Sequence, residues 1–235
     1  MSRIDSDIKA ADNISDDFKA ELEKVLRSVL IAAIALASTR GNVITTEDIE
    51  RLLTEKGFYQ VGEGLLTTGQ TELMDNARKY IAAEVKKEVE YSDDTIAKLE
   101  TVRKDNSDAY VLIGAVLAQK IVKELTSVEI GMAAPEAITE SLEKAVTTAG
   151  NQGATWTQTT TFDTYRNALV MLGIQEGLNR YRYHGPLDEK TRPFCRLHVD
   201  EVKTWQEWST IDNGMNGVVT VAMGGFRCRH ALIPV

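Results

Sequence analysis

Apolar residues recur at spacings of three and four positions from Ile14 to about Glu176, and no sustained run there alternates apolar and polar side chains. This period predicts amphipathic α-helices that each bury one face. After Tyr181 the helical period stops, and turn residues separate short apolar runs. The sequence therefore predicts a mainly α protein, with an elongated helical N-terminal body over residues 1–181 and a small C-terminal α+β module over residues 182–235.

Individual helix starts and strands have local signals of their own. Thr45 followed by Asp48 predicts a capping box at the start of a helix. Thr204 has a side chain suited to capping a second, short helix. The apolar runs at residues 218–222 and 228–235 are predicted as strands. All but the first of these signals lie in the C-terminal module.

A glycine-rich stretch interrupts the helical body. Gly150-Asn151-Gln152-Gly153 predicts the end of one helix and a hinge near residues 150–153. Six threonines lie between positions 154 and 164, and such a density of β-branched polar residues weakens helix preference. We therefore expect the last long helix to begin near Phe162.

Composition bounds the class of protein. The chain has 235 residues, of which 43% are hydrophobic and 26% charged, so it can bury a sizeable core. Its net charge is −8, and a basic nucleic-acid-binding surface is therefore not the expectation. The longest apolar run, Val29 to Ala37, is far shorter than the about 20 residues of a membrane span, so we expect no membrane partner.

Two features indicate the compartment. The N-terminal segment has no apolar run after its one arginine, so no secretory signal is expected. Two cysteines in the whole chain cannot form a disulfide framework, and this number fits a reducing environment. We expect the protein to be made and kept in a cytoplasm.

Two Cys/His pairs in the C-terminal module are the strongest chemical signal. Cys195 and His198 are three residues apart, on one side of a helical turn. Cys228 and His230 are two residues apart, on one face of a strand. Four such ligands suit tetrahedral zinc, although the 29 residues between the pairs match no standard finger spacing. The alternative is that both cysteines are buried small apolar residues, or neighbouring thiols that oxidise.

The C-terminal residues also resemble a known family. The two elements concerned are HGPLDEKTRPFC at residues 184–195 and GGFRCRHALIPV at residues 224–235. They are similar to the C-terminal signature of the phage Mu F-like, or head-morphogenesis, family of tailed-phage minor head proteins, in which Asp-x-x-Thr-Arg-x-x-Cys is followed by Asn-Cys-Arg-Cys or Asn-Cys-Arg-His. Arg227 stands where asparagine is common, and His230 where a second cysteine is frequent. The resemblance covers about the last 55 residues and does not extend to residues 1–160.

The resemblance implies a virion structural protein that performs no catalysis. Such a protein is assembled in the host cytoplasm, is present in few copies, and associates with the portal vertex or the capsid interior. Its implied partners are portal or capsid proteins, and further copies of itself in the particle. Contact with packaged DNA would be local, at a patch formed by Arg192, Arg196, Arg227 and Arg229.

An enzyme is the alternative interpretation. A metal-dependent hydrolase or nuclease delivered with the genome would place Asp188 and His184 beside the Cys/His set and a catalytic ion. This function requires an open coordination position, whereas a closed four-ligand site indicates a structural metal. The sequence leaves these two alternatives open.

Overall fold

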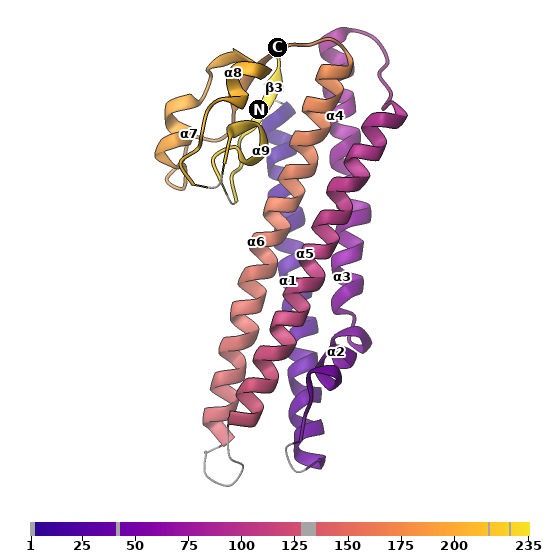
Figure 1. Cartoon of the computed structure of the whole chain (residues 1–235), viewed down its shortest axis with the longest axis vertical. Helices are drawn as coiled ribbons and strands as arrows, with labels where there is room; N and C mark the ends of the chain where they lie inside the picture. The colour runs from indigo at the N-terminus through magenta and orange to yellow at the C-terminus, as the bar shows by residue number, and fades with distance from the viewer. Residues whose placement is uncertain (1–2, 41–42, 128–134, 216, 226) are drawn as a thin grey trace. The chain divides into compact units, whose positions relative to one another are not determined.

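The computed structural model of the chain describes residues 3–40, 43–127, 135–215, 217–225 and 227–235. Its helical elements are α1 (Arg3–Thr39), α2 (Thr46–Glu55), α3 (Phe58–Gly64), the π-helical segment η1 (Leu65–Gly69), α4 (Gln70–Val85), α5 (Asp93–Ser127), α6 (Pro135–Gln175), α7 (Pro193–His198), α8 (Trp205–Ser209) and α9 (Val219–Ala222). Its strands are β1 (Arg180–His184), β2 (Val202–Thr204) and β3 (Ala231–Pro234) (Figure 1). The predicted class, mainly α with a small C-terminal α+β region, is confirmed. Within the described residues, no helix has a stretch both long and apolar enough to span a membrane.

Both predicted helix caps are present. The hydroxyl of Thr45 accepts a hydrogen bond from the amide of Asp48 at 3.2 Å, and the Asp48 carboxylate accepts one from the Thr45 amide. Thr204 and Glu207 form the same reciprocal pair at the start of α8. Each capping box satisfies two amide groups that a helix end would otherwise leave unpaired, which explains why α2 and α8 begin where they do.

The predicted helix end before Gly150 is wrong, because α6 is helical throughout the described stretch 150–153, where the hinge was expected. Three of the six threonines, Thr155, Thr157 and Thr164, are accommodated because their hydroxyls donate to main-chain oxygens one turn earlier, as Thr157 does to Gly153 at 2.8 Å. A Cβ at Gly153 would lie 2.2 Å from Cδ2 of Leu22. This glycine therefore allows two helices to pack closely.

One of the two predicted strands in the C-terminal module is wrong. The run at residues 218–222 forms the short helix α9, whereas the strand predicted near the C-terminus is present as β3. Val218 is extended and precedes the helix, and the turn that follows buries Val219 in the core of the module. Packing of this buried valine overrides the β-propensity of its neighbours.

The chain forms two compact units, and the long helices α1, α5 and α6 each contribute residues to both. Unit 1 comprises Met1–Ile14, Thr67–Lys104 and Gln158–Val235; unit 2 comprises Ser15–Leu66 and Asp105–Thr157. The units therefore do not divide between residues 181 and 182. The C-terminal α+β segment belongs to the same unit as the helical residues that precede it.

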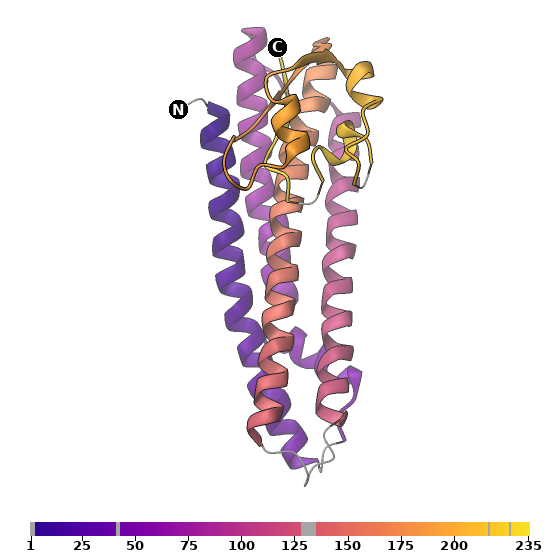
Figure 2. The same cartoon turned by 90° about the vertical axis from the view of Figure 1, so that its left-hand side faces the viewer.

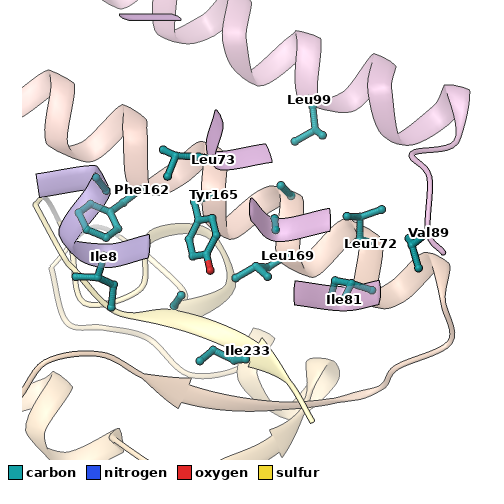
Figure 3. Packing of buried hydrophobic residues seen from close by; sticks show 14 residues of the cluster. Ile8, Leu73, Ile81, Val89, Leu99, Phe162, Tyr165, Leu169, Leu172 and Ile233 are labelled. Atoms are coloured by element: carbon teal, nitrogen blue, oxygen red, sulfur yellow. The ribbon is translucent and has the colours of Figure 1, made fainter. Parts of the chain in front are cut away.

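Unit 1 has a core built from helical segments and one strand. Figure 3 shows side chains from α1, α4, α5, α6 and β3 meeting in this core. Its labelled members are Ile8, Leu73, Ile81, Val89, Leu99, Phe162, Tyr165, Leu169, Leu172 and Ile233. The hydroxyl of Tyr165 donates to the carboxylate of Asp7 at 2.6 Å, which satisfies both buried polar groups.

The three strands form one antiparallel sheet in the order β2-β1-β3. Both views show this part of the chain beside the C-terminal half of α6 (Figures 1 and 2). All four residues of β3 are buried, and they alternate between two cores. Ala231 and Ile233 pack with the helices, whereas Leu232 packs with Tyr181 and Tyr183 of β1. Strand β3 therefore joins the C-terminal segment to the helical core of unit 1.

Unit 2 is organised around aromatic rings. Tyr110 of α5 stacks on Phe58 of α3, with ring centroids 4.7 Å apart and planes 7° apart. The Tyr110 hydroxyl donates to the main-chain oxygen of Phe58 at 3.0 Å. Phe18 and Trp156 pack against the same tyrosine ring. A Cβ at Gly62 would lie 2.2 Å from this ring, so the glycine makes the stack possible.

Candidate metal centre

The first ligand comes from the short helix α7. Pro193 occupies the first turn of α7, where a missing amide hydrogen carries no cost. Cys195 follows two residues later, and only 2% of its surface is exposed. The helix therefore turns the thiol into the protein immediately after the Thr-Arg of the first signature element.

The second and third ligands come from the segment that leads into β3. Cys228 and His230 are both buried and lie two residues apart. Gly225 and Arg227 before them have positive φ angles of 91° and 56°, which turns the chain sharply; Phe226 between them lies outside the described residues. This turn directs Cys228 back towards α7.

Three ligand atoms converge at this point. Among the described residues, Cys195, Cys228 and His230 form a buried set whose ligand atoms all lie within 4.8 Å of one another. The two sulfur atoms are 3.9 Å apart, and Nδ1 of His230 lies 3.7 Å from the sulfur of Cys228. Two thiols and an imidazole at these distances could hold a soft or borderline metal ion.

His198, the fourth predicted ligand, does not belong to this set. Its Nδ1 lies 2.7 Å from Oε2 of Glu201, and its ring packs against Phe194 at a centroid distance of 4.5 Å. The three-residue spacing from Cys195 predicted that both side chains lie on one side of a helical turn. In the structure the imidazole of His198 binds the carboxylate of Glu201, three residues later. The structure therefore does not bring His198 together with the other three predicted ligands.

Tyr183 of β1 completes the surroundings of the two sulfur atoms. Its hydroxyl donates to the sulfur of Cys195 at 3.4 Å and lies 3.8 Å from the sulfur of Cys228. Its ring stacks on that of His230, with centroids 5.2 Å apart and planes 22° apart. Tyr183 is fully buried, so its hydroxyl has no solvent alternative to these sulfur atoms.

Gly224 lies against the two sulfur atoms and the Tyr183 hydroxyl. A Cβ at this position would lie 2.3 Å from the sulfur of Cys195, 3.2 Å from that of Cys228 and 3.3 Å from the Tyr183 hydroxyl. The Gly224 amide also donates to the sulfur of Cys228 at 3.4 Å. The glycine is therefore required by the close approach of the backbone to these three atoms.

The two thiols have opposite pKa shifts. The pKa of Cys195 is raised, first because its thiol hydrogen-bonds to Cys228 and second because it is buried. The pKa of Cys228 is lowered, first because its sulfur accepts that hydrogen bond, with further contributions from His230 and Arg166. Burial raises the pKa of Tyr183, whose hydroxyl keeps its proton. The proton of the pair is therefore held more tightly at Cys195 than at Cys228, and both thiols must lose their protons to bind a metal.

Arg166 of α6 anchors the segment that carries two of the ligands. It is 4% exposed, and its guanidinium donates to the main-chain oxygens of both Cys228 and His230. A third hydrogen bond, of 2.8 Å, runs to the carboxylate of Asp163. One buried cation therefore satisfies two buried carbonyl groups and fixes the ligand segment to the helix.

The first signature element is folded on itself and bonded to the second. The carboxylate of Asp188 accepts hydrogen bonds from the Thr191 hydroxyl and from the Lys190 amide, each at 3.0 Å. Its other oxygen lies 2.5 Å from the guanidinium of Arg229. This ion pair, together with the hydrogen bonds, lowers the pKa of Asp188 to about 2.

Asp188 and His184 do not join the three metal-ligating side chains. Asp188 is engaged by Arg229, and Nε2 of His184 lies 3.5 Å from the carboxylate of Asp5. The arrangement predicted for a catalytic ion, with both residues beside the Cys/His set, is therefore not formed in the described residues. Two of the residues named for the enzyme interpretation, Asp188 and His184, therefore do not lie beside the Cys/His set.

The four arginines of the predicted DNA-contacting patch all donate hydrogen bonds within the chain. Arg192 donates to the main-chain oxygen of Gly224 at 2.7 Å, and Arg196 donates to that of Thr191 at 3.1 Å. Arg227 donates to the side chain of Gln158 at 3.0 Å, and Arg229 pairs with Asp188 as described above. These side chains join parts of unit 1.

Sequence reasoning did not identify Tyr183, Gly224 or Arg166 as parts of this site. Tyr183 had one available signal, because Tyr181 and Tyr183 alternate with arginines just before the first element and predict a strand face. Gly224 precedes Cys228 by four residues, which is a spacing compatible with a turn over the thiol. No sequence signal indicated Arg166, because it lies 62 residues before Cys228 in a helix whose apolar spacing is ordinary.

Comparisons of the chain with protein-family models, with curated protein sequences and with solved structures find no match. The functional interpretation therefore depends on the residues of the site and on the resemblance of the C-terminal elements.

Proposed function

We propose that this chain is a structural protein of tailed-phage heads, of the minor head or head-morphogenesis type, whose C-terminal segment folds around one zinc ion. Its partners in this role are portal or capsid proteins, and it acts by binding them. The proposal does not require catalysis. The observation that carries it is that residues of the two signature elements are bonded to one another.

Three separate contacts join the two elements. Asp188 pairs with Arg229, and Arg192 donates to the main-chain oxygen of Gly224. The sulfur of Cys195 lies 3.9 Å from that of Cys228. The residues that resemble the phage family are thus the residues that hold this segment together, which is what a structural role for the signature requires.

The spacing of the ligands supports zinc. A tetrahedral ion with zinc–sulfur bonds of about 2.3 Å and zinc–nitrogen bonds of about 2.0 Å would separate two sulfurs by about 3.8 Å and a sulfur from a nitrogen by about 3.6 Å. The corresponding distances are 3.9 Å between Cys195 and Cys228 and 3.7 Å between Cys228 and His230. These two distances match those expected around a bound zinc ion to within about 0.1–0.2 Å.

The departure of Arg227 from the family pattern is compatible with this geometry. Position 227 has a φ angle of 56°, in the left-handed region that asparagine adopts more readily than most other residues. The asparagine that is common at this position in the family suits the same backbone turn. Arg227 adopts the turn too, and its side chain bonds to Gln158.

Metal content tests the zinc part of the proposal. Protein purified without added metal should contain about one zinc per chain, and denaturation should release two titratable thiols. His230→Ala should lose the zinc, whereas His198→Ala, which removes the imidazole bonded to Glu201, should retain it. Protein with no metal, or equal zinc loss in both variants, would contradict the proposed site.

Particle composition tests the assembly part. Mass spectrometry of purified heads, from the phage that encodes the chain, should detect it at a small number of copies relative to the major capsid protein. Deleting the gene should reduce the yield of DNA-filled heads, and the wild-type gene supplied in trans should restore it. Heads that lack the chain, with normal yield in the deletion, would refute an assembly role whatever the metal content.

A further inference from the structure

The cluster has three conventional metal ligands, and the group at its fourth corner decides what the site can do. Three protein ligands with an exchangeable water are typical of catalytic zinc, whereas four protein ligands are typical of structural zinc. Cys195, Cys228 and His230 supply three. The next group in contact with both sulfur atoms is the hydroxyl of Tyr183.

We propose that the Tyr183 hydroxyl is the fourth ligand, and that it closes the metal site against water and exogenous anions. This inference rests on the zinc ion proposed above. A fourth protein ligand gives the site a structural role. Tyr183, which lies outside the Cys/His pattern, is then the residue that excludes exogenous ligands from the ion.

The distances place the hydroxyl at a coordination corner. In a tetrahedral zinc site an oxygen ligand lies about 3.6 Å from each sulfur ligand, given bonds of about 2.1 Å and 2.3 Å. The Tyr183 oxygen lies 3.4 Å from the Cys195 sulfur and 3.8 Å from the Cys228 sulfur. The stacked rings of Tyr183 and His230 direct both side chains along the same face of the sheet.

The cluster is shielded from bulk solvent. Tyr183 is fully buried, and Cys195, Cys228 and His230 are each less than 5% exposed. The backbone of Gly224 lies so close that a methyl group there would overlap with the sulfur of Cys195 and press against the sulfur of Cys228 and the Tyr183 hydroxyl. The Tyr183 hydroxyl is the side-chain oxygen that lies beside both sulfur atoms.

Charge balance is consistent with a phenol that keeps its proton. Two thiolates neutralise a divalent ion, and a neutral imidazole adds no charge, so the fourth ligand need not be an anion. The hydroxyl would bind the ion through an oxygen lone pair, and its hydrogen would then point away from the ion and the two sulfurs.

Tyr181 supplies a matched control on the same strand. It is also fully buried, and its hydroxyl donates to the main-chain oxygen of Leu178 at 3.0 Å, away from the cysteines. Tyr181→Phe and Tyr183→Phe each remove one buried hydroxyl from β1 with the same change in volume. Only the second removes an atom from the cluster.

The experiment is cobalt(II) substitution of the full chain, followed by visible spectroscopy with and without azide. We expect the wild-type protein and Tyr181→Phe to give tetrahedral thiolate spectra that azide does not change. Tyr183→Phe should become azide-sensitive, and its affinity for zinc should fall by about 10- to 100-fold. Circular dichroism of all three proteins checks that the fold is retained.

Two outcomes overturn the inference. An azide-sensitive wild-type spectrum would mean that the fourth position is open, and a Tyr183→Phe spectrum identical to wild type would mean that the hydroxyl is not a ligand. A wild-type chain that binds neither cobalt nor zinc would refute the metal centre itself, and this result is distinguishable from the other two.

Discussion

Nε of Arg166, in the middle of a long helix, donates a hydrogen bond of 2.7 Å to the main-chain oxygen of His230, 64 residues later in the chain. The same guanidinium bonds to the main-chain oxygen of Cys228. Two of the three candidate metal ligands are thus held to α6 through their backbones. Arg166 thus fixes the segment that carries these candidate ligands through main-chain oxygens.

Arg166→Met should destabilise unit 1 by about 3 kcal/mol, because two buried carbonyl oxygens lose their donor. Urea unfolding monitored by circular dichroism measures this change. Arg182→Met, which removes an exposed guanidinium from β1, is the control and should change stability by less than about 0.5 kcal/mol. Equal stabilities of the two variants would show that the hydrogen bonds of Arg166 make no net contribution to the free energy of unfolding.

Gly224→Ala should abolish stoichiometric zinc binding, because the added methyl group would lie 2.3 Å from the sulfur of Cys195. The measurement is zinc per chain by mass spectrometry. Gly214→Ala is the control: it strains a residue whose φ angle is 71°, but no atom lies within 4 Å of the added methyl group. Full zinc occupancy in Gly224→Ala would contradict the close approach.

The carboxyl group of Asp188 should titrate well below its ordinary pKa of 3.8, at about 2, because Arg229 stabilises the carboxylate. The ion pair therefore stabilises the fold fully above pH 4 and loses its effect as the pH falls from 3.8 through about 2. A ¹³C NMR titration of the carboxyl carbon measures the pKa. In Arg229→Gln the midpoint should rise towards 3.8, and an unchanged midpoint would exclude the ion pair as the cause.

Two glycines in α3 should respond in opposite ways to alanine. Gly62→Ala should destabilise unit 2 by about 1–3 kcal/mol, because its Cβ would overlap with the Tyr110 ring. Gly64→Ala should stabilise it by about 0.5–1 kcal/mol, because no atom lies within 4 Å of the added group and alanine favours the helix. Equilibrium unfolding of both variants tests the pair, and a loss of stability in both would contradict the packing difference.

The helical class was predictable because it depends on local pattern. The apolar residues recur every three or four positions, which is about one helical turn. The capping pair Thr45–Asp48 and the cap at Thr204 likewise join residues about one turn apart. Where local pattern misled, tertiary packing was the reason. Gly153 and the threonines after Gly150 predicted a break in the helix. Leu22 instead packs where a Cβ at Gly153 would lie, and the preceding helical turn accepts the hydroxyls of Thr155 and Thr157.

The candidate site was half predictable. Cys195, Cys228 and His230 could be named from residue type and short spacing, and the structure brings them together. His198 could be named in the same way, but the structure places it outside this set, with its Nδ1 bonded to Glu201, a residue of no special pattern. Spacing along the chain restricts which side chains share a face, but it does not decide which neighbour each of them will bind.

The sequence by itself determined that the chain is mainly helical and that its last residues form a different kind of structure, and it predicted two Cys/His pairs there as the candidate metal ligands. These properties follow from periodicity and residue type, which act over a few positions. Only the tertiary structure decided that the fourth neighbour is Tyr183 rather than His198, and that Arg166 holds the ligand segment in place. The physical reason is that hydrogen bonds and close packing join residues far apart in the chain, and such contacts form only when the backbone brings their atoms within about 3–4 Å.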